Sequence, residues 1–342
     1  MGGNSVQAGS GVSNAASMGP IMSGFWSSRR VLVTGGSGFL GSVVLEKLAQ
    51  RHAAEVVVPR SRDYDLTRVE EVRELFDDVA PDLVIHGAAQ VGGIGANLER
   101  PADLYVSNLL MGTFILQETC RRGVAKTVLL GTICSYPKFA SVPFSEESLW
   151  DGYPEETNAP YGIAKKALLV HAHANREQYG QKAIYLLPTN LYGPGDKFDP
   201  AVSHVIPALI RKFVEAKEDG SDHVVVWGSG RATREFLYVD DAAEGILLAA
   251  EHHDGAGPVN LGSGREIEIA ELAELIASIV GFEGGLRWDS SKPDGQPRRR
   301  VDTEKARRAF GFEARTSLED GLRRTVDWYL SHRDRADASI PI

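Results

Sequence analysis

The sequence predicts an α/β protein: a Rossmann-type, doubly wound parallel sheet with a smaller C-terminal α/β substrate domain. Three observations lead to this prediction. Short apolar runs alternate with stretches of helical length, a glycine-rich turn follows the first apolar run, and the alternation breaks after residue 187. Strands that alternate with helices in this way imply crossover connections and a sheet with helices on both faces.

The first half of the chain provides the elements of that sheet in order. Short runs of aliphatic and β-branched residues are typical of buried strands, which we expect at residues 31–34, 55–58, 83–86, 127–131 and 183–187. Helices are expected between them, at 41–51, 69–78, 102–122 and 161–179, with a long loop at 132–158. Residues 188–200 are rich in Pro, Gly, Asn and Asp, which end the alternation.

The remaining chain is expected to form a smaller unit that shares elements with the first. Its helices are predicted at 205–217, 240–251, 267–280 and 318–331, its strands at 224–227 and 259–261, and a polar, basic loop at 290–300. We therefore divide the chain into a flexible tail at 1–27, a Rossmann domain at 28–190 plus about 235–264, and a second domain at about 191–234 plus 265–335. The tail is rich in Gly, Ser, Ala and Asn and lacks the basic start and apolar stretch of a secretory signal.

Composition excludes several classes of function. The 342 residues include 37 Lys and Arg against 46 Asp and Glu, a formal charge of −9. An acidic chain has no general attraction to nucleic acids or anionic membranes, so neither partner is expected. No apolar run reaches the roughly 18–20 residues of a membrane span. The two cysteines, Cys120 and Cys134, are too few for a disulfide framework and favour a reducing compartment, so we expect a cytoplasmic protein. No metal is expected.

Three glycines mark a dinucleotide-binding turn. Gly35, Gly38 and Gly41 lie at a spacing of three between the first predicted strand and the first helix. The first permits the tight turn, the second lets the backbone approach a pyrophosphate, and the third lets the helix lie close to the sheet. The helix N-terminus then directs free N–H groups and positive partial charge at the phosphates.

The end of the second predicted strand indicates which dinucleotide binds. An acidic residue there would accept a hydrogen bond from the ribose 2′-hydroxyl of NAD, whereas an arginine suits the 2′-phosphate of NADP. The chain has Arg60 and Arg62 at this place, and we predict NADPH with Arg60 as the phosphate contact. Two solvated surface arginines are the alternative. Asp65 and Leu66 follow and are expected to line the adenine pocket.

A tyrosine and a lysine four residues apart predict carbonyl chemistry. Tyr161 and Lys165 begin a predicted helix, where this spacing places both side chains on one face. A phenol with an ordinary pKa of about 10 is a poor acid or base near neutrality, and a neighbouring cation lowers that pKa. Such a phenol can give a proton to the alkoxide that forms when a carbonyl is reduced. The hydroxyl of Thr132, just past the fourth strand, is placed to hold the carbonyl oxygen. The alternatives are a surface pair on one helix for Tyr161 and Lys165, and a simple turn or cap residue for Thr132.

Longer strings extend this pattern to most of the chain. They are HGAAQVGGI (86–94), PTNLYGP (188–194), SHV (203–205), REFLYVDD (234–241) and KPDG (292–295). Together with Thr132, Tyr161 and Lys165, these strings resemble the extended short-chain dehydrogenase/reductase superfamily and, within it, the GDP-L-fucose synthases, over about residues 30–330.

The resemblance implies a bifunctional, NADPH-dependent enzyme. It would convert GDP-4-keto-6-deoxy-D-mannose to GDP-L-fucose by epimerisation at C3 and C5 and reduction at C4, and it would be a homodimer. Thr132, Tyr161 and Lys165 match the reductase residues, while Cys134 and His204 match the acid/base pair of the epimerase. The alternatives are a 4-ketoreductase or epimerase acting on a related GDP-4-keto sugar, including a heptose, and a non-catalytic nucleotide-binding sensor.

The same resemblance assigns the binding residues. Cofactor contacts are implied at Gly35, Gly38, Phe39, Leu40, Gly41, Arg60, Asp65, Leu66, Ala88, Ala89, Lys165, Pro188, Asn190, Leu191 and His204. Substrate contacts are implied at Asn190, Val205, Lys212, Trp227, Arg234, Asp294 and Arg299. An indole can stack on guanine, and the basic side chains can neutralise a diphosphate. The chain departs from the family string GSSCIYP by reading GTICSYP at 131–137, so that Ile133 removes a hydroxyl and is expected to reshape the pocket around C3 or C6 of the sugar.

Overall fold

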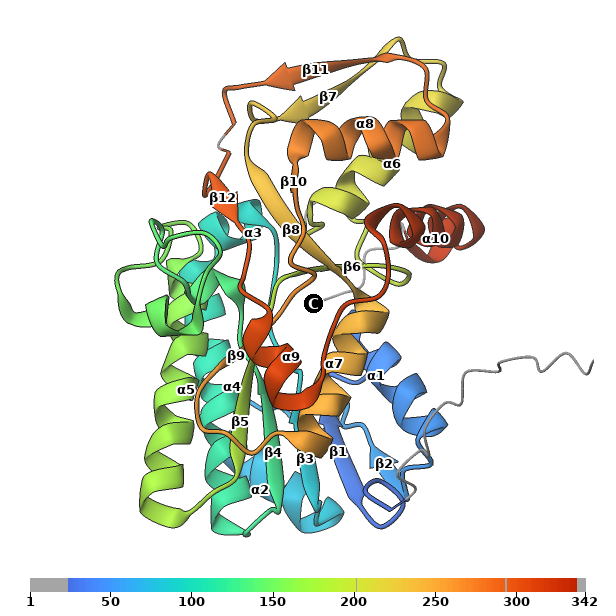
Figure 1. Cartoon of the computed structure of the whole chain (residues 1–342). Coiled ribbons are helices and arrows are strands. Elements are labelled where there is room, and N and C mark those ends of the chain that lie inside the picture. The colour runs from blue at the N-terminus through green and yellow to red at the C-terminus, as the bar shows by residue number, and fades with distance from the viewer. Residues whose placement is uncertain (1–23, 201, 293, 337–342) are drawn as a thin grey trace, which may run out of the picture.

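The larger part of the molecule is built on a parallel sheet. The computed structural model describes residues 24–200, 202–292 and 294–336. In this part of the chain the sheet has six strands in the order β2-β1-β3-β4-β5-β9, and every neighbouring pair is parallel (Figure 1). The strands are β1 (Arg30–Thr34), β2 (Glu55–Val57), β3 (Leu83–His86), β4 (Lys126–Leu130), β5 (Ala183–Pro188) and β9 (Val259–Leu261). The predicted doubly wound sheet is confirmed, with the strand order reversing between β1 and β3.

Helices cover both faces of this sheet. They are α1 (Phe39–Gln50), α2 (Val69–Val79), α4 (Pro101–Arg121), α5 (Ala159–Tyr179) and α7 (Val239–His252). The short helix α3 (Ile94–Glu99) lies against α4, and 3₁₀ turns occur at Ile133–Ser135 and Glu146–Trp150. Alternate residues of β1 face opposite cores: Leu32 packs with α2 and α4, whereas Val31 and Val33 pack with α1 and α7. No helix in the described ranges is long and apolar enough to cross a membrane.

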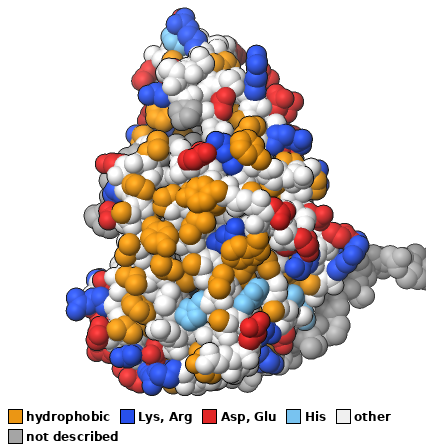
Figure 2. Space-filling model, turned by 90° about the vertical axis from the view of Figure 1, so that its left-hand side faces the viewer, with side chains coloured by type: hydrophobic (Ala, Val, Ile, Leu, Met, Phe, Trp, Pro, Cys, Tyr) orange, Lys and Arg blue, Asp and Glu red, His pale blue; other side chains and the backbone are white. Residues whose placement is uncertain are grey.

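The outer surface of α4 and α5 is partly apolar. Figure 2 shows hydrophobic side chains gathered on the side of the molecule that carries α5 and the loop before it. The exposed large hydrophobic residues include Val106 of α4, Val170 of α5, and Phe139, Trp150 and Tyr153 of the loop before α5. Contiguous apolar surface of this kind is typical of an interface with another protein.

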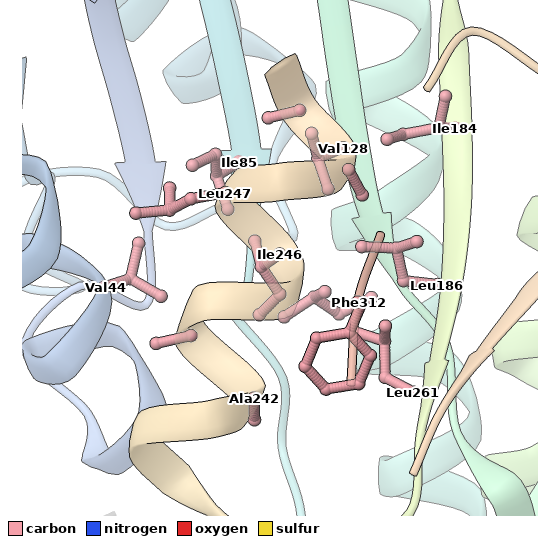
Figure 3. Packing of buried hydrophobic residues seen from close by; sticks show 14 of the residues in the cluster. Val44, Ile85, Val128, Ile184, Leu186, Ala242, Ile246, Leu247, Leu261 and Phe312 are labelled. Atoms are coloured by element: carbon pink, nitrogen blue, oxygen red, sulfur yellow. The ribbon is translucent and has the colours of Figure 1, made fainter. Parts of the chain in front are cut away.

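The core between α7 and the sheet continues into the last third of the chain. Figure 3 shows Leu247 of α7 near Ile85 of β3, and Ile246 of α7 near Phe312, in the core cluster that also contains Val128 and Ile184. Phe312, which follows α9 (Glu304–Phe310), fills the space beside Leu261 of β9. This packing fixes the C-terminal segment against the strand ends where the site lies.

A second set of strands lies beyond the carboxyl ends of the large sheet (Figure 1). Its described strands pair around β8 (Thr233–Tyr238): β6 (Asn190–Tyr192) and β12 (Arg298–Arg299) run parallel to it, and β10 (Glu266–Glu268) runs antiparallel. A separate parallel pair is formed by β7 (His223–Trp227) and β11 (Gly285–Asp289). The helices are α6 (Val205–Glu218), α8 (Ile269–Val280), α10 (Leu318–Ser331) and α11 (Arg333–Ala336), and most of them share one hydrophobic core with β7 and β8.

Several of these elements depart from the sequence-based prediction. β8 was not predicted, because Arg234 and Glu235 interrupt its apolar pattern. β12 lies inside the segment predicted as a loop, and β10 occupies the first residues of the predicted helix at 267–280, which begins at Ile269. Such two- or three-residue strands are defined by backbone pairing with β8 and leave little trace in composition.

The predicted tail is too long at its C-terminal end. Residues 1–23 lie outside the described residues. Trp26 is only 2% exposed, packs in the core of the large sheet, and donates from its indole N–H to Glu251. Phe25 packs beside it, under the guanidinium of Arg29. The domain boundaries stay a prediction.

Candidate active site

The residues predicted to bind the cofactor begin at the carboxyl ends of β1 and β3, where the strand order reverses. Ligands of doubly wound sheets bind at this position. Gly35 has a φ of +73°, and a Cβ there would lie 2.7 Å from the Ala88 nitrogen. A Cβ on Gly41 would lie 2.1 Å from the Gly35 oxygen. Both positions therefore require glycine. Gly35 lets the turn after β1 touch the loop after β3, and Gly41 lets the start of α1 lie against that turn.

The N-terminus of α1 is open to an anion. Gly38 is its N-cap, and within the described chain no side chain caps the helix. The free N–H groups of the first turn, which begins at Phe39 and Leu40, carry positive partial charge and fit a pyrophosphate. The residues present therefore fit a dinucleotide.

Arg60 is exposed just past β2, and its side chain has no hydrogen bond or ion pair with any described residue. Arg62, by contrast, pairs with Asp63 at 3.5 Å. Arg60 is thus the arginine available to a phosphate.

The Asp65 carboxylate accepts from the Thr67 hydroxyl and backbone N–H at 2.7 and 2.9 Å, and these bonds lower its pKa. Leu66 is buried in the core under α2. Both side chains serve the fold here, and their contact with adenine stays a prediction.

Tyr161 and Lys165 lie one turn apart at the start of α5, as the spacing predicts. Lys165 is 2% exposed, and burial lowers its pKa to about 8. Burial and the neighbouring Cys134 raise the pKa of Tyr161, although a hydrogen bond with the Thr132 side chain opposes the shift. The predicted net lowering of the Tyr161 pKa is therefore wrong in this structure, because desolvation of the phenol is the largest influence and raises the pKa. Tyr161 is a neutral phenol near pH 7, which is the form that donates a proton.

Thr132 and Cys134 lie on the 3₁₀ turn after β4. The Thr132 hydroxyl accepts from the Cys134 backbone N–H at 3.2 Å, and the Ser135 hydroxyl donates to the Gly162 oxygen at 2.9 Å. These bonds dock the turn on the start of α5, so that Thr132, Cys134 and Tyr161 converge. Ile133 is 3% exposed and packs in a hydrophobic cluster with Leu129. The expectation that it reshapes the sugar pocket is not supported, because its side chain is enclosed by the core.

The Cys134 sulfur has a cationic partner. Arg299 Nη1 donates to Cys134 Sγ at 3.6 Å, and Arg299 Nε donates to Gln296 Oε1 at 2.8 Å. Both Arg299 and Gln296 are buried. The arginine therefore brings positive charge from β12 to the turn that carries Cys134.

His204 is the N-cap residue of α6, but its side chain makes no capping hydrogen bond within the described chain. Desolvation by the surrounding protein, together with the positive charge of Lys197, lowers the pKa of its imidazole. A Cβ on Gly93 would lie 2.9 Å from the Ser203 oxygen, so the loop after β3 touches the residue before His204. That contact directs the start of α6 toward the ends of the large sheet.

The predicted substrate residues form a basic surface around β7 and β8. Arg234 Nη2 donates to the backbone oxygen of Asp294 at 2.8 Å. Burial, together with the positive charge of Arg299, lowers the Arg234 pKa to about 10. Lys212 donates to the Val225 oxygen at 2.9 Å and lies 5.8 Å from the Trp227 ring. Trp227 is 61% exposed, and the ammonium of Lys292 also lies over its ring, 5.1 Å from the centroid.

Comparison with known proteins identifies the family. The model of the NAD dependent epimerase/dehydratase family matches residues 31–262. The chain belongs to this family. GDP-L-fucose synthase 1 of Arabidopsis thaliana is 45% identical over 305 residues, which are 89% of this chain and 94% of that protein. The predicted resemblance to GDP-L-fucose synthases is therefore confirmed.

Solved structures of related proteins agree with this assignment. A GDP-L-fucose synthetase from Naegleria fowleri bound to NADP superposes with a TM-score of 0.84 at 30% identity, over 91% of this chain and 96% of that one. A GDP-6-OMe-4-keto-L-xylo-heptose reductase from C. jejuni has a TM-score of 0.83 at 28% identity, over 89% of this chain and 98% of the other. The fold of this epimerase/dehydratase family member is thus shared with enzymes that act on different GDP-sugars.

Some predicted residues of this family member have structural partners. The Asp294 carboxylate accepts from the Ser229 backbone N–H and hydroxyl at 2.6 and 2.7 Å, so it holds the turn after β7. The Asn190 side-chain amide donates to the backbone oxygen of Glu235 at 2.8 Å and so connects β6 to β8. The remaining predicted contacts, at Ala89, Pro188, Leu191 and Val205, lie in the loop after β3, at the end of β5, in β6 and at the start of α6. Their ligand contacts stay predictions.

Two buried residues near the site were not predicted. Gln296 joins Arg299 to the cysteine loop, and Glu235 accepts from the backbone N–H groups of Val301 and Gly264, both at 2.7 Å. Glu235 is fully buried, and this raises its pKa to about 7. Neither residue lies in a spaced motif that signals a role, although Glu235 adjoins Arg234 in the string REFLYVDD.

Proposed function

We propose that this protein is an NADPH-dependent 3,5-epimerase/4-reductase that converts GDP-4-keto-6-deoxy-D-mannose to GDP-L-fucose. The observation that carries the proposal is the convergence of Thr132, Cys134 and Tyr161 where the 3₁₀ turn docks on α5. One turn thereby presents a reductase hydroxyl and a cysteine suited to proton transfer. The GDP-L-fucose synthase of Arabidopsis thaliana supports the choice of substrate.

The cofactor site is assigned from the cradle around α1. The first-turn N–H groups of α1 would hold the pyrophosphate, and the unpaired Arg60 would hold the 2′-phosphate. Lys165, on the same helix face as Tyr161, would reach the ribose next to the reacting ring. NADPH, when bound, supplies the hydride for C4. The NADP-bound relative from Naegleria fowleri supports this choice of cofactor.

Reduction at C4 requires a proton as well as a hydride. The Tyr161 phenol is neutral, because burial raises its pKa, and it donates that proton to the C4 oxygen. The Thr132 hydroxyl, which hydrogen-bonds with the phenol, orients both groups toward the carbonyl. Lys165 is buried beneath them, and its charge stabilises the phenolate that remains.

Epimerisation requires two groups on opposite faces of the sugar. At C3, and again at C5, a C–H bond breaks and its electron pair forms an enolate with the C4 carbonyl. One of Cys134 and His204 takes that proton, and the other returns a proton to the same carbon from the far side. Thiol and imidazole titrate closest to neutrality among the side chains, which suits both steps.

Substrate binding is assigned to the basic surface near β8. Trp227 would stack on guanine, while Lys212 and Arg234 would neutralise the diphosphate. Asn190 and Val205 would line the sugar pocket between the two sheets. This local positive charge lets an acidic protein bind an anionic substrate.

We further propose a homodimer that packs through α4 and α5. The exposed side chains of Val106 and Val170 on these helices support this interface, as does the gathering of hydrophobic side chains on this side of the molecule (Figure 2). Sedimentation with the substitutions Val106→Glu and Val170→Glu tests it, because two buried charges would dissociate the pair. A cytoplasmic location stays a prediction that fractionation would test.

The function is tested by incubating the protein with GDP-4-keto-6-deoxy-D-mannose in heavy water, with and without NADPH. Oxidation of NADPH with deuterium at C3 and C5 and a GDP-L-fucose product is expected. Oxidation without deuterium would leave a plain 4-reductase. If neither signal appears in a protein that binds NADPH, a related GDP-4-keto sugar, such as the heptose of the C. jejuni relative, becomes the substrate to test. Failure with every GDP-sugar would leave a nucleotide-binding sensor.

A further inference from the structure

A closed ring of hydrogen bonds begins and ends on the cysteine loop. Gln296 Nε2 donates to the backbone oxygens of Pro137 and Lys138 at 3.3 and 2.8 Å. Its Oε1 accepts from Arg299 Nε at 2.8 Å, and Arg299 Nη1 returns to Cys134 Sγ at 3.6 Å. Gln296 is 3% exposed and Arg299 is 7% exposed, so little water competes for these bonds. The segment around β12 is thereby locked to the loop that carries Cys134.

The chemistry of Cys134 depends on this lock. Whether the sulfur takes or gives a proton, it carries a negative charge at one end of each transfer. A buried guanidinium that donates to sulfur stabilises that charge strongly, because the local dielectric is low. The guanidinium is planar, so the acceptor on Nε sets the direction in which Nη1 points.

The Arg299 side chain has other charged groups nearby toward which it could turn. It interacts electrostatically with Glu155, whose carboxylate accepts from Thr157 and Asn158. It also lies close enough to Arg234 for the two like charges to oppose each other. Without an acceptor on Nε, the side chain would regain rotamer freedom and turn from the sulfur toward the carboxylate.

We propose that Gln296 is a positioning residue for proton transfer: it holds the Arg299 guanidinium against Cys134 Sγ, so that an N–H donor is in place for the sulfur when the proton moves. The inference rests on the proposed function, because only epimerisation requires Cys134 to exchange a proton with the sugar. A purely structural role for Gln296, joining two loops, would change stability and leave the reactivity of the thiol unaltered.

Thiol alkylation tests the proposal without any sugar. In a Cys120→Ser background only Cys134 can react, and its rate with iodoacetamide is followed between about pH 6 and 10. In Gln296→Leu, which has similar size but no amide, the midpoint is expected to rise by about one pH unit, with a rate about tenfold lower near neutrality. The matched control is Arg298→Gln on the same strand, because Arg298 pairs with Glu266 and not with Cys134. Its midpoint is expected to stay unchanged.

A second variant guards against misfolding of the first. Arg299→Lys keeps the positive charge, but one ammonium cannot reproduce the fork between Gln296 and Cys134. It is expected to shift the alkylation midpoint in the same direction. Unchanged midpoints in both variants, with folding verified by thermal unfolding, would overturn the proposal.

Deuterium exchange at C3 and C5 links the thiol to the reaction. The pH profile of exchange in Gln296→Leu is expected to move with the alkylation midpoint. If alkylation shifts but the parent protein exchanges no deuterium, the proposed function fails while the contact between Gln296 and Arg299 stands. If exchange is intact in the parent and its profile is unmoved in Gln296→Leu, the positioning role is wrong and the proposed function stands.

Discussion

Gly162 lies so close to the backbone of Cys134 that no side chain fits between them. A Cβ on Gly162 would be 2.4 Å from the Cys134 oxygen, well inside van der Waals contact. Gly162 directly follows Tyr161, and its own oxygen accepts from the Ser135 hydroxyl at 2.9 Å. The distance between the phenol and the thiol is therefore set by backbone packing.

Gly162→Ala is expected to separate these groups. The methyl must push the 3₁₀ turn away from α5, so both deuterium exchange and NADPH oxidation should fall by about a hundredfold, since small misplacements are costly in catalysis. The free energy of unfolding should drop by about 1–3 kcal/mol because the contact is overpacked. Gly95→Ala in α3 is the control, as its Cβ would meet nothing within 4 Å. A Gly162→Ala protein with parental activity would contradict the tight docking.

Arg60→Ser is expected to weaken discrimination between NADPH and NADH. One charge-assisted contact with the 2′-phosphate contributes about 1.5–3 kcal/mol, so the ratio of kcat/KM values for the two cofactors should fall roughly tenfold to a hundredfold. Arg62→Ser is the matched control, because Arg62 pairs with Asp63 and should leave the ratio unchanged. Equal effects of both substitutions would show that general surface charge, rather than a specific contact, selects the cofactor.

Lys165→Met is expected to stabilise the protein near neutral pH while abolishing reduction. Burial lowers the Lys165 pKa from 10.5 to about 8, so the folded state disfavours the ammonium that the unfolded chain accepts freely. Below pH 8 the full cost is present, and it is relieved as pH rises from about 8 to 10.5. Methionine removes that cost and should add about 1–3 kcal/mol at pH 7, with a smaller gain at pH 10. Urea unfolding at both values measures this, and a loss of stability at pH 7 would contradict it.

The sequence predicts the large sheet and much of the site because local patterns specify them. Helical spacing brings Tyr161 and Lys165 to one face, and the glycine spacing marks the turn at α1. What it misses depends on long-range partners. β8 contains Arg234 and Glu235, whose side chains are satisfied by distant partners: the backbone oxygen of Asp294 for Arg234, and the backbone N–H groups of Gly264 and Val301 for Glu235.

Other misses have the same cause. Gln296 meets Pro137 and Lys138 across about 159 residues, and no local pattern encodes that contact. In the sequence Trp26 belongs to a polar tail, whereas in the structure it is packed in the core and donates to Glu251. The sequence suggests that Ile133 reshapes the sugar pocket, but its side chain points into the core. That direction depends on how the turn docks on α5, which local sequence does not specify. Ionisation is missed too, since burial of Tyr161 reverses the shift that its sequence neighbour predicts.

Glu235→Gln is expected to change how stability depends on pH. Burial raises the Glu235 pKa from 4.5 to about 7, so between these values the unfolded chain is ionised while the folded protein holds the proton. The stabilising contribution is therefore complete below about pH 4.5 and is lost as pH rises through 7, up to about 3 kcal/mol in all. Glutamine keeps one acceptor for the N–H groups of Val301 and Gly264 and cannot ionise.

The difference in unfolding free energy between Glu235→Gln and the parent should thus shift by about 1–3 kcal/mol in favour of the variant between pH 5 and 8. Denaturant unfolding across that range measures it, and Glu266→Gln, at a partly buried salt bridge with Arg298, is the control. A constant difference would show that Glu235 is ionised throughout, with its charge held by the strand and turn that it joins.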